Sequence, residues 1–390
     1  MKKICIVTTL WSSISNWIKP FLNEYNKLGI DVTVVCNMDA EYEEALKQEF
    51  PFVHTHAIPF PRGISFGGSI KSVLSLKKFF KKEKFDLVQY STPNASMYAS
   101  LASRLSRVPV RLYCQWGMVY VTRSGIRRKI FKMMEKTICK NSTMIQPDSF
   151  GNLEFCRKEG LYDEKKSCVI WNGSAKGLDL TAYDVTKKTE FAAEIKAKYG
   201  ISDDDIVVGF VGRLGREKGC NELFTAFKEI KQKHENAKLL FVGPLEKEET
   251  IDPELLSYFK SCDDIIKTDR VSNVEKYMSA MDVFALPSYR EGFGMSVVEA
   301  SAMEVPVVAT RYPGPSGGMI EGVTGIAVDV KDTEGLTKAI LSLLEDREKA
   351  AEMGKAGRRH VLQNFDQVIF KQKYMKNRLQ LLGIDQESKG

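Results

Sequence analysis

Long apolar runs are absent from this sequence of 390 residues. No stretch of 18 or more apolar residues occurs, which excludes a transmembrane helix. No C-x-x-C pair occurs among the eight cysteines, and only four histidines are present. Cysteines scattered in this way are typical of reduced, buried thiols in a cytosolic protein, and we expect no metal site. The dinucleotide fingerprint G-x-G-x-x-G and the phosphate loop G-x-x-x-x-G-K-[ST] are also missing, which argues against a dehydrogenase.

Acidic residues are scarce in part of the first half of the chain. Residues 61–140 contain 17 Lys and Arg against 3 Asp and Glu, whereas the whole chain carries a formal charge of +7. Much of this positive charge falls in two segments, 69–84 and 123–140, with apolar residues at helical spacing. The apolar positions are Ile70, Val73, Leu74 and Phe80 in the first segment and Ile126, Ile130, Met133, Met134 and Ile138 in the second.

These two basic segments leave two interpretations open. They are either ordinary amphipathic helices with solvated lysines, or they are attracted to an anionic membrane surface at about 1 kcal/mol per basic side chain. We expect the second, so that the protein is cytoplasmic and peripheral at the inner face of the cell membrane. No nucleic-acid-binding motif accompanies the charge, and we expect no nucleic acid partner.

Short β-rich runs alternate with longer helical patterns along the chain. The predicted strands are 3–8, 31–36, 54–58, 87–90, 110–114, 143–145, 168–171, 206–211, 239–242, 265–267, 283–286 and 307–309. Near-continuous apolar strands separated by helices indicate parallel sheets covered on both faces. The start of the chain, MKKICIVTTLWSS, admits a signal peptide, but its short apolar run favours a first strand.

The expected fold class is therefore α/β, with two doubly wound Rossmann-like lobes that face each other across a cleft. We assign residues 1–172 to the first lobe, 173–190 to a linker and 191–365 to the second lobe. Residues 366–390 are expected to form a terminal helix that crosses back to the first lobe. Ligands of such folds bind beyond the carboxyl ends of the strands, which would place a site in the cleft.

The clearest motif, F-V-G-R-L-G-R-E-K-G, follows the first predicted strand of the second lobe. Gly212 and Gly215 permit a tight turn, and the free N–H groups of the helix that follows favour an anion. Arg213 and Lys218 flank the position where that anion would lie. The alternative is a solvated loop in which these cations pair with Glu217 or nearby acids.

A second motif, S-Y-R-E-G-F-G-M-S-V-V-E-A, follows the predicted strand 283–286. Its helix start again offers N–H donors to an anion. Glu291 lies in the loop, and Glu299 lies within the helix, where it could accept hydrogen bonds from two vicinal hydroxyls. Taken singly, each acid is more simply a helix-dipole partner or a surface acid. Together, the two motifs fit a diphosphate with a sugar on either side.

The run G-R-L-x-x-x-K-G followed by E-G-F-G-x-x-x-x-E resembles the retaining family 4 glycosyltransferases, which have the GT-B fold. The likeness extends to the runs V-F-A-L-P-S, V-P-V-V-A-T and G-V-T-G. W-N-G-S-A-K-G-L-D at 171–179 resembles a segment typical of members that extend lipid-linked saccharides in bacterial polysaccharide or O-antigen assembly. The likeness is specific over residues 165–380, and over residues 1–160 it rests on the order of strands and helices.

This resemblance implies a role for each residue of the two motifs. Arg213 and Lys218 would bind the diphosphate of a nucleotide-sugar donor and act in catalysis. Glu291 would contact the transferred sugar, and Glu299 would hold the ribose. The backbone after Glu291, the first turn of the helix and a nucleobase loop complete the implied donor site, which adds Gly292, Phe293, Gly294, Met295, Ser296, Arg270 and Val271.

Two departures from the family pattern fall in the first lobe. Where many members carry a His-Gly pair, C-Q-W-G stands here, so that Gln115 takes the place of a catalytic histidine that contacts the transferred sugar. A glutamine can donate to a hydroxyl or a phosphate, but it cannot exchange a proton near neutral pH. The family's Gly-Gly after the first strand is replaced by L-W-S-S.

The resemblance implies transfer of a hexose from a nucleotide-diphosphate sugar, here a UDP-sugar, to a saccharide or a polyprenyl-diphosphate-linked acceptor. The transfer would retain the anomeric configuration and need no cofactor or metal ion. The leaving diphosphate would take the acceptor's proton, while Arg213 and Lys218 stabilise its charge. A nucleotide-sugar 2-epimerase and a non-catalytic nucleotide-sugar-binding protein remain as alternatives.

Overall fold

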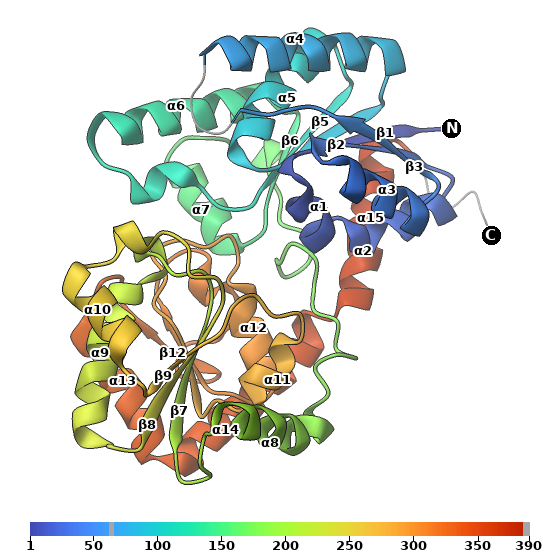
Figure 1. The fold of residues 1–390 in the computed structure, drawn as a ribbon. Helices are drawn as coiled ribbons and strands as arrows, with labels where there is room; N and C mark the ends of the chain where they lie inside the picture. Colours follow the sequence, from blue (N-terminus) through green and yellow to red (C-terminus); the bar gives the residue numbers. More distant parts are fainter. Residues whose placement is uncertain (62–65, 385–390) are drawn as a thin grey trace. The chain divides into compact units, whose positions relative to one another are not determined.

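The computed structural model describes residues 1–61 and 66–384. In it the chain divides into two compact units (Figure 1), each built on a six-stranded parallel sheet. Unit 1 comprises Met1–Lys176 and Val368–Gly390, and unit 2 comprises Gly177–Gln367. The predicted α/β fold with two doubly wound units is confirmed. The segment 173–190, expected to be a linker, contributes two buried side chains to the core of unit 2, those of Leu178 and Tyr183.

Unit 1 has the strand order β3-β2-β1-β4-β5-β6. Its strands are β1 (Lys3–Leu10), β2 (Asp31–Asn37), β3 (Val53–Ala57), β4 (Leu87–Tyr90), β5 (Val110–Gln115) and β6 (Met144–Pro147). One face of this sheet is covered by α1 (Trp11–Trp17), α2 (Lys19–Lys27), α3 (Ala40–Glu49) and α15 (Gln367–Leu381). The other face is covered by α4 (Phe66–Glu83), α5 (Pro93–Leu105), α6 (Gly125–Asn141) and α7 (Phe150–Lys158). Short 3₁₀ turns lie at Val119–Thr122 and Glu164–Lys166.

Unit 2 repeats this order from its own first strand, as β12-β11-β10-β7-β8-β9. Its strands are β7 (Ile206–Val211), β8 (Ala237–Val242), β9 (Ile265–Lys267), β10 (Val283–Leu286), β11 (Val307–Thr310) and β12 (Gly325–Val328). On one side lie α9 (Cys220–Lys233), α10 (Pro253–Ser261) and α13 (Thr333–Glu345) (Figure 1). On the other lie α8 (Lys188–Tyr199), α11 (Val274–Ser279), α12 (Met295–Ala302) and α14 (Arg347–Asn364). Further 3₁₀ turns lie at Val185–Lys187, Arg216–Lys218, Glu248–Thr250 and Pro315–Gly318.

The strands form because their side chains are apolar on both sides and find a helical layer on each. All four residues of β10 and of β11 are buried, as are the first five residues of β7. Continuous burial of this kind is expected for parallel strands between two helical layers. The structure describes eight cysteines, all of them free. No helix within residues 1–61 and 66–384 is long and apolar enough to cross a membrane.

One predicted strand is absent, and one strand was not predicted. The predicted strand 168–171 is absent, because only Ser167 bridges to β6 before Trp171 turns the chain with a φ of 49°. Conversely, the sequence analysis missed β12 (Gly325–Val328), which pairs with β11 over its four residues. A four-residue strand that begins with glycine and lies at a sheet edge gives little periodic signal.

The apolar face predicted for residues 69–84 is also partly wrong. Phe80 is buried on α4, together with Leu76, which the prediction did not include. Ile70 and Leu74 are 62% and 57% exposed. The side of α4 that packs against α5 is the one that carries Leu76 and Phe80.

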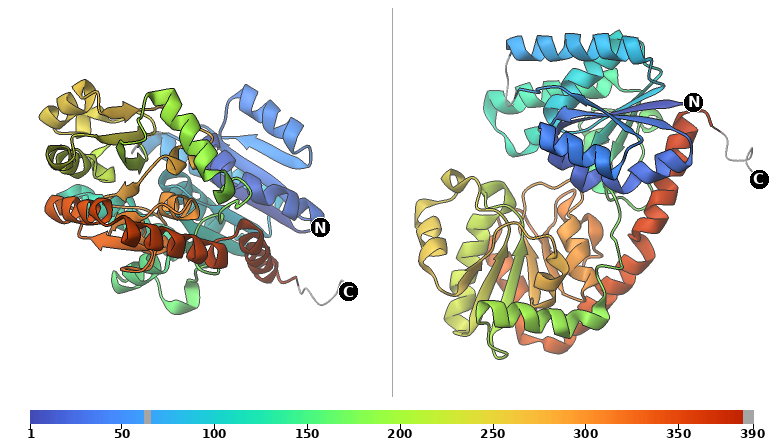
Figure 2. Two further views of the ribbon diagram at one scale, coloured as in Figure 1. Left: turned by 90° about the horizontal axis from the view of Figure 1, so that it is seen from below. Right: turned by 45° about the vertical axis from the view of Figure 1, so that its right-hand side comes forward.

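The last helix, α15, completes the core of unit 1. Figure 2 shows it running beside α2, and the ring of Tyr374 stacks on Phe21 with centroids 4.0 Å apart. The Tyr25 hydroxyl donates to the Tyr374 hydroxyl at 3.2 Å. Leu379 of α15 belongs to the same apolar cluster and is 4% exposed. Residues near the C-terminus therefore stabilise strands near the N-terminus.

We expect Leu379→Ala to lower the free energy of unfolding of unit 1 by about 2–5 kcal/mol, through lost apolar burial and the cavity left behind. The neighbouring exposed Gln380→Ala is the matched control and should unfold as the wild type does. Urea unfolding followed by tryptophan fluorescence measures this effect, because all four tryptophans lie in unit 1. Equal stability of the two variants would show that α15 is not part of this core.

Candidate functional site

Two loops of unit 2 meet where its strand order reverses. Strand β7 continues to β8 on one side of the sheet, whereas β10 lies on the other side of β7. Right-handed crossovers place the helices after these two strands on opposite faces, so a crevice opens between their carboxyl ends. The loops that leave the two strands, 212–219 and 287–294, carry both sequence motifs.

The two loops are in direct contact. Gly219 has a φ of 72°, and a Cβ atom there would lie 2.0 Å from the carbonyl oxygen of Pro287. Only glycine fits this approach. The Tyr289 N–H donates to the carbonyl oxygen of Glu217 at 2.9 Å, and the buried Ser288 hydroxyl oxygen lies 3.2 Å from the same oxygen. These contacts hold the two loops together.

Lys218 and Glu291 come together where these two loops meet. The Lys218 Nζ lies 2.5 Å from the Glu291 Oε1, and the two side chains are 19% and 17% exposed. The Ser288 hydroxyl donates to the same carboxylate oxygen at 2.8 Å. The sequence analysis assigned Lys218 to a diphosphate and Glu291 to a sugar without expecting them to pair. The structure shows that they are neighbours.

Glu217 binds three cations from three loops. Its carboxylate lies 3.4 Å from Arg213, 3.1 Å from Lys247 and 3.2 Å from Arg290. Burial alone would raise the pKa of Glu217, but the charges of Arg290 and Lys247 outweigh it and lower the pKa to about 2. The pairing of Arg213 with Glu217 is the alternative that the sequence left open. Lys247 and Arg290 were missed, since neither stands in a position that the motifs single out.

The loop 287–294, which carries the second motif, packs closely against the loop after β11. Gly294 has a φ of 74° and precedes α12, and Met295 and Ser296 form its first turn. A Cβ atom on Gly314 would lie 2.3 Å from the Glu291 carbonyl oxygen, so this glycine permits the approach. Phe293 is 3% exposed and packs into the core of unit 2, and Gly292 before it is partly exposed.

Glu299 lies half-buried in the second turn of α12, where it hydrogen-bonds Tyr183. Burial and the neighbouring carboxylate raise the pKa of Tyr183, so its hydroxyl stays protonated and can donate to Glu299. The sequence analysis missed Tyr183 because it stands in a polar stretch that reads as a linker.

Three further residues of the predicted site lie outside these two loops, and the nucleobase contact of Arg270 and Val271 stays a prediction. Arg270 and Val271 follow the edge strand β9, two strands away from β7, and Arg270 is exposed. Gln115 belongs to unit 1 and is fully buried on β5. Its amide donates to Glu135 at 2.5 Å and accepts from the Tyr162 hydroxyl at 2.8 Å. The expected contact of Gln115 with a sugar is therefore corrected, because its hydrogen-bonding groups are used inside the core.

Among residues 1–61 and 66–384, no three His, Cys, Asp or Glu side chains come together as ligands for a metal ion. The cations on the loops at this crevice are Arg213, Lys218, Lys247 and Arg290, each paired with Glu217 or Glu291.

Comparison with known proteins places this arrangement in a family. The family model described as glycosyl transferases group 1 matches residues 191–360, and one described as glycosyl transferase 4-like matches residues 3–149. The capsular polysaccharide biosynthesis glycosyltransferase CapM of Staphylococcus aureus is 30% identical over 344 residues, which is 88% of each chain. The chain belongs to the group 1 glycosyltransferases.

Other relatives of this glycosyltransferase agree with the assignment. An Escherichia coli enzyme named UDP-Gal:alpha-D-GlcNAc-diphosphoundecaprenol alpha-1,3-galactosyltransferase is 25% identical over 325 residues, which is 81% of each chain. Among solved structures, Anabaena HepE in complex with UDP aligns with a TM-score of 0.77 over 97% of this chain and all of that chain, at 19% identity. Sucrose-phosphate synthase from Thermosynechococcus elongatus aligns with a TM-score of 0.78 over 98% of this chain and all of that one, at 19% identity. These similarities show the GT-B fold.

We expect Glu217→Gln to destabilise this glycosyltransferase by about 3 kcal/mol at pH 7, because the pKa of Glu217 drops from its ordinary 4.5 to about 2 on folding. A lowered carboxyl pKa stabilises the fold above the ordinary pKa, and the contribution is lost as the pH falls toward the folded value. The difference between wild type and variant should therefore shrink between about pH 5 and pH 2.

Urea unfolding of unit 2 over this pH range, followed by circular dichroism, measures that difference. The exposed Glu235→Gln is the matched control and should unfold like the wild type at every pH. A stability gap for Glu217→Gln that does not change with pH would contradict the ionic role of Glu217.

Proposed function

We propose that this glycosyltransferase moves a hexose from a UDP-sugar to a saccharide or a polyprenyl-diphosphate-linked acceptor, with retention at the anomeric carbon, in cell-surface polysaccharide assembly. The observation that carries the proposal is the pair of contacting loops at the strand reversal of unit 2, which brings Lys218 within 2.5 Å of Glu291. The names of the relatives from Staphylococcus aureus and Escherichia coli support the pathway and the class of acceptor.

In the proposed reaction the bond from the anomeric carbon to the diphosphate oxygen breaks, and a bond to the acceptor oxygen forms on the same face of the sugar. The acceptor's proton passes to the leaving diphosphate, so no protein nucleophile is required. Negative charge grows on the diphosphate as it leaves. Arg213 and Lys218 stabilise that charge, and their positions are fixed before the reaction by the carboxylates they contact.

The ion pair of Lys218 and Glu291 suits an exchange of partners when the donor binds. A diphosphate oxygen can replace the Glu291 carboxylate as acceptor for the lysine, since both are anionic oxygens. Glu291 then accepts hydrogen bonds from the hydroxyls of the transferred sugar. Glu299, held by Tyr183, takes the ribose hydroxyls in the same proposal.

Unit 1 supports a peripheral association with membranes, where a polyprenyl-linked acceptor resides. Helices α4 and α6 both pack against α5, so they lie on one face of the unit (Figure 1). Five apolar side chains on their outer sides are exposed, those of Ile70, Leu74, Ile126, Ile130 and Met133. Exposed cations flank them, including Lys71, Lys78, Lys81, Arg127, Lys129 and Lys136. We refer to this set as the basic apolar surface. Such surfaces bind anionic lipid through charge and insert apolar side chains into the interface.

We expect Lys218→Ala to lower kcat for transfer from the UDP-hexose by about 100- to 1,000-fold, since one positioned donor to the developing charge is removed. The exposed Lys233→Ala, on α9 of the same unit, is the control and should keep wild-type turnover. Turnover comes from released UDP, and NMR of the product's anomeric proton tests retention. Near-normal kcat in Lys218→Ala would refute its role, and an inverted product would refute the mechanism.

We expect the triple variant Lys71→Glu, Lys78→Glu and Lys129→Glu to bind anionic vesicles at least about 100-fold more weakly, at about 1 kcal/mol for each basic side chain removed. Lys233→Glu, Lys260→Glu and Lys355→Glu together make the same change of charge on unit 2 and should leave binding intact. Flotation with phosphatidylglycerol and phosphatidylcholine vesicles measures both variants. Equal wild-type binding to the two lipids would argue against the electrostatic account.

A further inference from the structure

Unit 1 contains a small pocket lined by aromatic and hydrogen-bonding side chains. It lies at the carboxyl ends of β4, β5 and β6 and is closed on one side by α15. Two of the four tryptophans of the chain, Trp17 and Trp116, belong to its wall, and both are partly exposed. Their ring centroids lie 5.9 Å apart. Large aromatic side chains that stay partly exposed offer flat apolar faces to a ligand.

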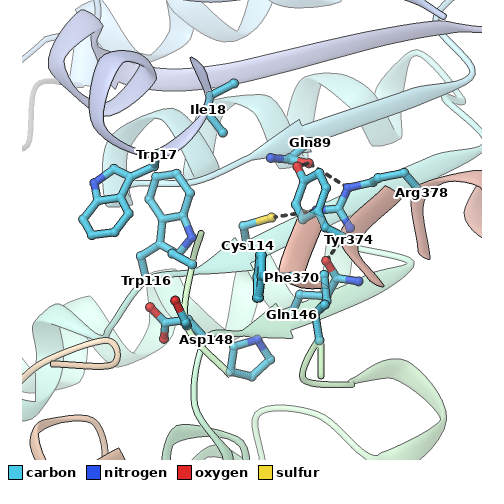
Figure 3. Close-up of a pocket in the computed structure, with 14 residues that line it drawn as sticks. Trp17, Ile18, Gln89, Cys114, Trp116, Gln146, Asp148, Phe370, Tyr374 and Arg378 are labelled. Atoms are coloured by element: carbon cyan, nitrogen blue, oxygen red, sulfur yellow. Dashed lines mark hydrogen bonds between the residues drawn. The ribbon is translucent and has the colours of Figure 1, made fainter. Parts of the chain in front are cut away.

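The polar groups of the pocket stand on two sides of it. Figure 3 shows Asp148 below Trp116 and Trp17, with Gln89, Gln146 and Arg378 grouped on the opposite side. One side thus carries a carboxylate, which accepts hydrogen bonds, and the other carries a guanidinium, which donates them. A sugar hydroxyl both donates and accepts, so it matches this arrangement of groups.

Arg378 is a charged residue that the core of unit 1 holds with neutral partners. It is 1% exposed. It donates to the side-chain oxygens of Gln89, Gln146 and Asn377 at 2.7–3.1 Å, and to the Cys114 sulfur at 3.7 Å. Its guanidinium also lies 4.0 Å from the ring centroid of Tyr374. A buried cation is costly to a fold unless hydrogen bonds compensate it, as these do for Arg378, which also lines the pocket.

The backbone around the carboxylate is held rigidly. The Ser174 N–H donates to the Asp148 carbonyl oxygen at 2.7 Å, and Ser174 has a φ of 80°. Trp171, in the same loop, has a φ of 49°. Non-glycine residues in this region are strained, and such strain concentrates at functional sites.

The size of the pocket limits what enters it. Its volume of about 30 Å³ has room for about two water-sized groups, too few for a sugar ring. One exocyclic hydroxymethyl group, a carbon and an oxygen, matches that space. The ring that bears it would remain at the mouth, against the tryptophan faces.

We propose that this pocket is a saccharide subsite that binds a hexopyranose of the acceptor, with its ring on Trp17 and Trp116 and its hydroxymethyl group between Asp148 and Arg378. The assignment rests on the proposed function, since it supplies the acceptor of the same transfer. It also explains why a tryptophan stands at this edge of the sheet in C-Q-W-G. The subsite selects hexoses with a free hydroxymethyl group over pentoses.

Saturation-transfer NMR on the full chain tests this subsite without knowledge of the natural acceptor. The probes are the methyl α-pyranosides of glucose, galactose and xylose, of which the xyloside lacks the hydroxymethyl group. We expect at least one hexoside to bind, with the strongest transfer to its hydroxymethyl protons. It should bind about tenfold or more tightly than the xyloside. Trp17→Ala and Trp116→Ala should each abolish the signal, Trp17→Phe should keep part of it, and the exposed Leu105→Ala, at the far end of α5, should not change it.

The rise in melting temperature with UDP, measured on the same samples, separates this proposal from the previous one. UDP binding together with saccharide binding that survives both alanine variants would overturn the subsite and leave the donor site standing. UDP binding without saturation transfer from either hexoside would overturn it too. Saccharide binding that depends on the tryptophans, in a protein that does not bind UDP, would support the subsite and refute the proposed donor.

Discussion

The reversal of strand order in each sheet determines where that unit can hold a site. In both sheets the chain leaves its first strand toward one edge, returns, and continues toward the other. Because each crossover is right-handed, the loops on either side of the return point diverge to opposite faces and leave a crevice at the carboxyl ends. In unit 2 this crevice holds the loops after β7 and β10, with Lys218 and Glu291. In unit 1 the corresponding edge carries Trp17, Trp116 and the pocket beside them.

A site for a diphosphate needs several cations close together, and these repel one another when no ligand is bound. Glu217 resolves this conflict by accepting contacts from Arg213, Lys247 and Arg290 at 3.1–3.4 Å. Because the pKa of Glu217 is about 2, its charge persists throughout the physiological range. Lys218 is neutralised separately, by Glu291. The cations are thus positioned in advance, as the proposed exchange of a carboxylate contact for a phosphate oxygen requires.

The sequence predicts well those features that depend on local spacing. Both basic segments form helices, eleven of the twelve predicted strands are present, and the two motifs lie in the loops where they were expected. The sequence does not predict contacts between loops that are distant along the chain. Lys218 and Glu291 are 73 residues apart, and nothing in their spacing indicates that they meet. Tyr183 shows the same limit, since its polar neighbours conceal a side chain that is buried against α12. The buried face of α4 depended on where α5 lies, which no periodicity reports.

The alternation of side chains along β5 explains why Gln115 does not take the role of the family histidine. Tyr113 and Gln115 point to the same side of the sheet, where both hydrogen-bond Glu135. Burial raises the pKa of Glu135 to about 7, and the two hydrogen bonds oppose that rise by favouring the carboxylate. The hydrogen bond from Gln115 satisfies the Glu135 carboxylate inside the core. Leaving that carboxylate without a partner would destabilise the fold by more than a hydrogen bond from Gln115 to an exposed ligand would stabilise the complex. Trp116, the next residue, lines the pocket instead, so the end of β5 presents an indole there.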